Sequence, residues 1–347
     1  MATFFELQEK NRKRTKLIVV CFVLFFIWLG AGLDLTIYFW GDGSVRTKSH
    51  GYSRDLSPSS VVSGAPKREK RFRPIFTVII GLAGVGVAWW SMTNAAANVL
   101  SAMHAKPADR NRSPEELALV NVVEEMAISS SIIPPKVWII PDPDPNALAV
   151  GLTSDDYHIA VTQGLLRTLT RDELQGVVAH EIAHLKNQDT RLMTTLTVLV
   201  GLSALISEFV ARSRLLNLAG EGGDSEESKI GVALFVLWLV SVLVAPLATQ
   251  LMALMVSRER EFLADASAAQ FTRNPEALAH ALEKIAAATA RTAFVKPASA
   301  HLCIASPLSD DLDYQAADSW FATHPPIKTR IHRLLTIGKR MAVQGSH

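Results

Sequence analysis

Four apolar stretches constrain the fold of this 347-residue chain more than any other feature. Each approaches the roughly 20 residues that a bilayer span requires, and they lie at 17–40, 75–92, 192–211 and 230–256. A buried core helix is the alternative for any one stretch, but the fourth is long and nearly free of charge, and only Asp34 interrupts the first. Tyr38 and Trp40 close the first stretch and Trp89 and Trp90 close the second, where amphipathic rings favour lipid headgroups. We therefore predict four transmembrane helices that lie in a lipid bilayer.

The composition agrees with a membrane protein. Hydrophobic residues make up 49% of the chain and the mean hydropathy is +0.20, which is high for a soluble globule. A formal net charge of +2 gives no reason to expect nucleic acid as a partner. The two cysteines, Cys21 and Cys303, lie far apart, and Cys21 falls in an apolar stretch, so we expect a reducing compartment rather than a disulfide.

The remaining segments predict an α+β soluble part. We expect a basic N-terminal segment at 1–16, a flexible basic loop at 41–74, and two soluble segments at 101–190 and 257–347. The first soluble segment contains helix N-terminal signals and short β-like runs at 137–140, 146–150 and 158–162. The second is expected to be mostly helical. The predicted fold class is therefore a mainly α membrane protein with an α+β domain.

A helix expected to start near Thr170 carries the sequence HEIAH, with His180, Glu181 and His184. Four residues turn a helix by about 400°, so both imidazoles point the same way, about 6 Å apart, as one tetrahedral zinc ion requires. Glu181 could then reach a zinc-bound water and take its proton. The alternative is an exposed helix with two histidines that serve only the fold.

A catalytic zinc ion needs a third protein ligand, and the candidates lie in SREREFLADASAA, just after the fourth span. Glu259, Glu261 and Asp265 compete for this role. Glu261 and Asp265 share one helical face, whereas Glu259 points away. Glu261 as ligand would leave Asp265 to accept a histidine N–H from outside the ligand set. A solvated charged helix start is the alternative.

Chain topology favours the metal site. His184 lies about two helical turns before the third span, and Glu261 lies about one turn after the fourth. Two consecutive spans return the chain to the side that it left, so both segments emerge on the same face of the membrane. The predicted site therefore lies at the membrane surface.

These motifs together resemble the membrane zinc metallopeptidases of the HtpX type, which are relatives of the CAAX prenyl proteases. The resemblance is carried by HEIAHLKNQD and SREREFLAD, and also by NALAVGL, HLCIASPLS and HPPIKTRI. It covers the chain from about residue 75 onward and implies a zincin-like α+β catalytic domain. Two features depart from the family pattern: Leu148 replaces the usual aromatic residue, and the connection 41–74 is longer and more basic.

Carried over to this sequence, the resemblance implies that His180, His184 and Glu261 bind one zinc ion and that Glu181 is the general base. It also suggests that Asp265 and Asn187 orient the ligands. His324 and Arg330 would stabilise the oxyanion of the tetrahedral intermediate. Alternative roles remain for Asn187, which could be a helix-end cap, and for His324, which could be a structural residue before Pro-Pro. Asn146, which belongs to the expected substrate-binding segment, could instead be a turn residue.

The segment expected to bind substrate consists of Asn146, Ala147, Leu148 and Ala149. The resemblance implies that it is an edge strand that pairs with the substrate backbone. Such a strand accepts only an extended chain, so the expected substrates are unfolded or misassembled membrane proteins. The implied location is the cell inner membrane, with several spans and a cytoplasmic active site.

Two other functions stay open from the sequence. One is a non-catalytic membrane protein in which a structural zinc ion clamps the soluble segments to the spans. The other is a prenyl-peptide protease, although those relatives carry more spans. Charge does not settle the orientation, because the loop 41–74 is at least as basic as the N-terminus.

Overall fold

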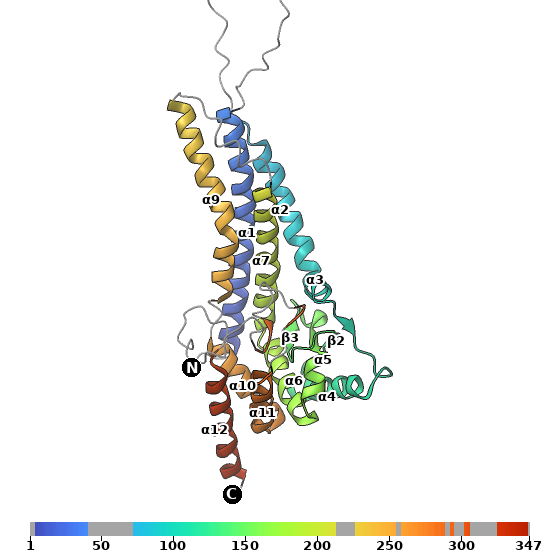
Figure 1. Cartoon of the computed structure of the whole chain (residues 1–347). Helices are drawn as coiled ribbons and strands as arrows, with labels where there is room; N and C mark the ends of the chain where they lie inside the picture. The colour runs from blue at the N-terminus through green and yellow to red at the C-terminus, as the bar shows by residue number, and fades with distance from the viewer. Residues whose placement is uncertain are drawn as a thin grey trace, which may run out of the picture. The chain divides into compact units, whose positions relative to one another are not determined.

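The computed structural model describes residues 4–40, 72–212, 226–254, 258–288, 292–294, 302–305 and 325–345. It is mainly helical, and Figure 1 colours the chain from α1 in blue to α12 in red. The expected loop 41–74 lies outside the described residues except for 72–74, and the predicted site residue His324 lies outside them as well. The helices are α1 (Phe4–Trp40), α2 (Ile75–Thr93), α3 (Ala95–Ala102), α4 (Pro114–Ser130), α5 (Gln163–Thr168), α6 (Arg171–Lys186), α7 (Asp189–Arg212), α9 (Glu226–Leu254), α10 (Arg258–Thr272), α11 (Pro275–Ala286) and α12 (Ile327–Gly345), with a short 3-10 helix, η1 (Ser154–Asp156).

The chain forms two compact units. The first unit is drawn from residues 1–22, 87–206 and 245–347, and the second from residues 23–86 and 207–244. All described residues of the candidate site belong to the first unit.

The expected spans correspond to α1, α2, α7 and α9. Within the described residues, three stretches are long and apolar enough to cross a membrane: Lys13–Tyr38, Ile75–Thr93 and Asp189–Glu208. Helix α9 has 29 residues and contains the apolar stretch Gly231–Ala245. A mainly α membrane protein with about four spans is therefore confirmed.

Asp34, the acid that interrupts the first span, lies inside the second unit. Its carboxylate accepts hydrogen bonds from Phe76 N at 3.0 Å and from Thr77 N at 2.7 Å, at the start of α2. These are backbone donors that a helix N-terminus leaves without intrahelical partners. Gly30 permits the close approach of the two helices, because a Cβ there would lie 2.5 Å from Phe76 O.

The first unit contains a four-stranded sheet in the order β1-β2-β4-β3. The strands are β1 (Lys106–Pro107), β2 (Lys136–Ile140), β3 (Ala147–Val150) and β4 (His158–Thr162). The pair β2–β4 is parallel and the other two pairs are antiparallel. The three β-like runs of the sequence thus form β2, β3 and β4, and β3 stands at one end of the sheet.

Helix α6 is the central element of the first unit. It begins with a capping box, in which Thr170 and Glu173 satisfy each other's backbone N–H groups. Its side chains are buried nearly all round, and it contacts α4, α10, α11 and β3. At Gly176 a Cβ would lie 2.9 Å from Leu278 N, so the missing side chain lets α11 cross closely. This packing fixes the helix that carries HEIAH.

Candidate metal centre

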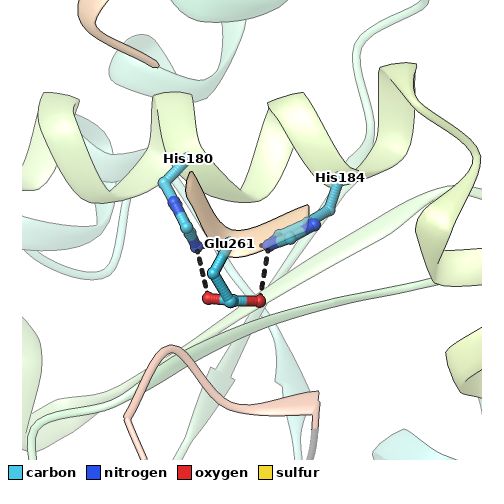
Figure 2. Close-up of side chains that lie close together, drawn as sticks. All are labelled: His180, His184 and Glu261. Atoms are coloured by element: carbon cyan, nitrogen blue, oxygen red, sulfur yellow. Dashed lines mark hydrogen bonds and ion pairs between the residues drawn. The ribbon is translucent and has the colours of Figure 1, made fainter. Parts of the chain in front are cut away.

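Three potential metal-ligand side chains meet between α6 and α10 (Figure 2). The Nε2 atoms of His180 and His184 are 3.2 Å apart. Glu261 Oε2 lies 3.6 Å from His180 Nε2, and Glu261 Oε1 lies 3.5 Å from His184 Nε2. Figure 2 shows both rings turned toward the one carboxylate. The helix geometry anticipated from the sequence therefore holds, and the third group is the glutamate expected there.

These spacings suit a tetrahedral zinc ion. Ligand bonds of about 2.0–2.1 Å in tetrahedral geometry place neighbouring ligand atoms about 3.3 Å apart. The measured 3.2, 3.5 and 3.6 Å lie close to that value. Two imidazole nitrogens and one carboxylate are also a donor set that zinc accepts.

Charge balance supports the same conclusion. The described charged residues in and around the ligand network are Glu181, Asp189, Arg260, Glu261, Asp265 and Arg330. With both imidazoles neutral, as metal ligation requires, four ionised carboxylates against two guanidinium groups leave two negative charges. All six side chains are buried, and buried charge is costly unless it is paired. One divalent cation would balance this excess.

His180 is oriented by a carboxylate that is itself bound to arginine. Asp265 Oδ1 lies 2.9 Å from His180 Nδ1, and Arg330 donates to Asp265 through Nε at 2.9 Å and Nη2 at 2.8 Å. Burial raises the pKa of Asp265, but the Arg330 charge and hydrogen bonds from His180 and Arg330 outweigh it and hold that pKa at about 2. Burial and Arg330 lower the pKa of His180, whereas hydrogen bonds to Asp265 and Glu261 raise it, with a net value of about 9. Asp265 thus lies where an orienting acceptor is expected.

The second histidine has a carboxylate beside its Nδ1 atom that the sequence motifs did not single out. Asp189 Oδ2 lies 3.3 Å from His184 Nδ1, and Asp189 Oδ1 lies 3.4 Å from Arg260 Nη1. Asn187 instead ends α6, with its backbone N–H directed to Ala183 O. The helix-end alternative fits Asn187 better than an orienting role. The signal for Asp189 in the sequence was an acid five residues after the second histidine, at the start of a span.

Glu181 is 2% exposed and shares a pocket with the three potential ligands. Burial raises the pKa of its carboxyl group. The residues that line this pocket are Ala149, His180, Glu181, His184, Asp189, Thr190, Met193, Glu261, Leu302, Cys303 and Ile304.

The outer edge of β3 already carries a segment of the same chain. Residues 302–305 lie along it, with an antiparallel bridge between Leu148 and Cys303. Ile304 N donates to Ala147 O at 3.0 Å. Ala149, near the other end of the strand, lines the pocket. Of the four residues expected to bind substrate, Ala149 is thus the one that borders the pocket.

Asn146 holds this segment in place. Its Nδ2 donates to Ala305 O at 3.0 Å, and its Oδ1 accepts from Ala147 N at 3.0 Å. The side chain is buried, with only 2% of the residue exposed. These contacts turn the Asn146 amide toward residues 302–305 and give it a structural role there.

Arg330 is fully buried and is absent from the pocket lining. Besides Asp265, its guanidinium contacts Ile304 O at 3.0 Å and Glu261 Oε2 at 3.4 Å. A side chain engaged by these acceptors inside the core is poorly placed to bind an oxyanion in the pocket. The geometry favours a role in holding the ligand network together.

Two histidines on one helix, a carboxylate from a second helix and a buried glutamate beside the first histidine all open on one pocket next to a strand. In a chain with membrane-spanning helices, this arrangement defines a membrane metallopeptidase. Residues 113–337 match the sequence profile of peptidase family M48. The chain belongs to that family.

Individual HtpX-type relatives agree with this assignment. A protease HtpX homolog of Caldanaerobacter subterraneus subsp. tengcongensis is 33% identical over 337 residues, which cover 96% of this chain and 98% of that one. A protease HtpX homolog of Dictyoglomus turgidum is 42% identical over 222 residues, or 64% of this chain and 70% of that one. The crystal structure of S. mikatae Ste24p is similar with a TM-score of 0.42 and 20% identity, covering 76% of this chain and 58% of that one.

The protein is therefore a membrane metalloendopeptidase. Membership of a peptidase family favours this activity over a non-catalytic protein with a structural zinc clamp. The long matches to HtpX-type proteases favour it over a prenyl-peptide protease.

Proposed function

We propose that this metalloendopeptidase uses one zinc ion to hydrolyse unfolded or misassembled membrane proteins at the cytoplasmic face of the cell inner membrane. The observation that carries the proposal is the cluster of His180, His184 and Glu261, whose ligand atoms all lie within 4.8 Å of one another. The ligand spacing and the charge balance both support zinc.

The side chains of the site divide the chemistry. When bound, zinc would polarise the scissile carbonyl and lower the pKa of water. Glu181 takes the proton of the attacking water and delivers it to the leaving amine. Burial raises the pKa of Glu181, which makes its carboxylate a stronger base. Asp265 accepts from the Nδ1 side of His180, so that the Nε2 lone pair of that ring faces Glu261 and the pocket.

We propose that an extended substrate meets β3 at its Ala149 end. Ala149 lines the pocket, whereas Ala147 O is already bonded to Ile304 N. Pairing along the whole strand would require residues 302–305 to move away from it. An extended backbone fits such an edge, while a folded domain presents none. Unfolded protein is therefore the substrate class that suits this site.

The membrane assignment of the substrate rests on α7. Asp189, Thr190 and Met193 come from the first two turns of this candidate span, and all three line the pocket. A catalytic pocket built on the end of a span lies close to the bilayer surface. Polypeptide that emerges from the membrane would reach this pocket before polypeptide from bulk solution does. The cytoplasmic side is proposed from the resemblance and from the absence of paired cysteines in the sequence.

The test is proteolysis of a model unfolded membrane protein by the purified full chain in detergent. Cleavage should depend on zinc and stop with a chelator. Glu181→Gln should retain zinc but lose activity by about 10²-fold or more, because a positioned acid–base group contributes about 10²–10⁴-fold. Activity within a few-fold of wild type, or loss of zinc from this variant, would contradict the assignment.

A further inference from the structure

Each imidazole of the metal centre has a carboxylate beside its Nδ1 atom, and each carboxylate has an arginine. On the His180 side the chain of contacts runs through Asp265 to Arg330. On the His184 side it runs through Asp189 to Arg260, at 3.3 Å and 3.4 Å. The second chain was not expected from the sequence motifs.

The second chain of contacts is shielded from solvent. Asp189 is 3% exposed and Arg260 is 8% exposed. A buried ion pair is sensitive to the loss of either partner, because the remaining charge is left uncompensated. The contact between Asp189 and His184 is therefore held in place on both sides of the carboxylate.

The chemistry of a histidine ligand explains why this matters. A ring that binds metal through Nε2 must carry its proton on Nδ1, and an acceptor at Nδ1 fixes both the tautomer and the ring plane. Nε2 of His184 faces His180 and Glu261, so Asp189 lies on the opposite side of the ring. This is the position of an orienting acceptor and not of a ligand.

The two partners come from different helices near the predicted spans. Asp189 is the first residue of α7, where the helix dipole favours a negative charge. Arg260 lies in the first turn of α10, which follows α9. The contact therefore links a metal ligand on α6 to the first turn of a membrane-spanning helix. A plain structural role at the start of α7 is the competing explanation.

We propose that Asp189, held by Arg260, is the positioning residue for His184 and couples the metal centre to the start of α7. This inference rests on the proposed zinc site. It adds to that site the pair of Asp189 and Arg260, which bind no metal themselves; removing either side chain should weaken metal binding.

The experiment measures zinc affinity of the full chain in detergent by competition with a chromophoric chelator. Asp189→Ala should weaken zinc binding about 10–100-fold, the usual cost of removing a partner outside the ligand set. Asp189→Asn keeps the side-chain volume and an acceptor oxygen but loses the charge, so its loss should be smaller, a few-fold. The visible absorption of the cobalt-substituted protein should change in Asp189→Ala, because the orientation of His184 changes.

Glu173→Gln is the matched control. Glu173 is also a buried acid paired with a cation, Lys284, at 2.7 Å, but it lies at the other end of α6 and outside the pocket lining. This variant should lose stability while its zinc affinity stays within about twofold of wild type. An equal loss of zinc affinity in Glu173→Gln would show a general effect of destabilisation and overturn the inference.

Two other results separate the inference from the proposed function. If wild type binds zinc tightly and Asp189→Ala shows the same zinc affinity and the same cobalt spectrum, the positioning role alone is overturned. Failure of wild type to bind zinc would overturn both. If Asp189→Ala does not fold, Asp189→Asn decides, since unchanged affinity and spectrum in that variant contradict the role.

Discussion

Glu261 brings a carboxylate to two imidazoles that a single helix already holds side by side. Its two oxygens reach different rings, with Oε2 near His180 and Oε1 near His184. Arg330 also lies 3.4 Å from Oε2, so the carboxylate is held from a third direction. At the scale of single residues, the site is a set of charged groups that position one another.

Glu261→Ala should lower zinc occupancy by at least about tenfold, because it removes a ligand rather than a neighbour of one. Metal analysis of the purified protein measures this, and circular dichroism should show unchanged helix content. Glu259→Ala serves as the control, since the sequence predicts that this side chain points away from the site. Equal zinc losses in the two variants would show that the third ligand is wrongly assigned. The side chain of Glu259 lies outside the described residues.

At the scale of elements, α6 links the catalytic motif to the stability of the first unit. Its N-terminus is closed by Thr170 and Glu173, and Lys284 on α11 binds the same glutamate. Its C-terminal half carries His180 and His184. A helix that is buried all round and capped in this way places its side chains reproducibly. The cap contributes to the stability of the first unit, while the packing of the C-terminal half against α10 and β3 holds the two histidines in place.

Glu173→Gln should lower the unfolding temperature at pH 7 by roughly 2–4 °C, the effect of about 1 kcal/mol on a domain of this size. Burial raises the pKa of Glu173, but hydrogen bonds from Lys284 and Thr170 outweigh it and lower that pKa. A lowered folded-state pKa stabilises the fold above the unfolded-state value of about 4.3. That stabilisation is lost as the pH falls through the folded-state pKa.

The difference between wild type and Glu173→Gln should accordingly be largest near neutral pH and shrink below about pH 4. Thermal unfolding of both proteins across this pH range measures it. A difference that stays constant from pH 7 to pH 3 would argue against a charged interaction at this position.

At the scale of the whole molecule, parity of the spans sets the topology. Two spans, α7 and α9, separate the segment with HEIAH from the segment with Glu261. A metal ion shared by these segments requires both on the same face of the membrane. The loops near residues 41–74 and 212–229 are then expected on the other face. The charge of the loop 41–74 opposes this orientation, which makes the test informative.

Single cysteines at Ser59, Ser154, Ser225 and Gln270, in a chain without its native cysteines, can be labelled in intact cells by a membrane-impermeant thiol reagent. Ser154 and Gln270 are exposed positions on η1 and α10. We expect labelling at Ser59 and Ser225 alone. Labelling at both Ser154 and Gln270 would place the peptidase outside the cytoplasm. Labelling at one of these two positions would exclude a shared zinc ion.

The sequence by itself determined the features that depend on neighbours a few residues away. Apolar runs of span length predict membrane helices because the bilayer thickness sets the length. The four-residue spacing of His180 and His184 puts both rings on one side of a helix because backbone hydrogen bonds fix the helical pitch. Short β-like runs bounded by turn residues predicted β2, β3 and β4 for a similar local reason.

Only the tertiary structure decided which distant groups meet. Asp189 rather than Asn187 lies at His184 because α7 starts where its first residue faces the ring. Asn146 turns to Ala305, 159 residues away, because residues 302–305 occupy the edge of β3. Arg330 lies inside the ligand network and not at the pocket. Each of these outcomes depends on how the elements pack against one another. The packing energy is a sum over many contacts, and the residues that make these contacts are often far apart in the sequence, so the sequence alone does not show which of them meet.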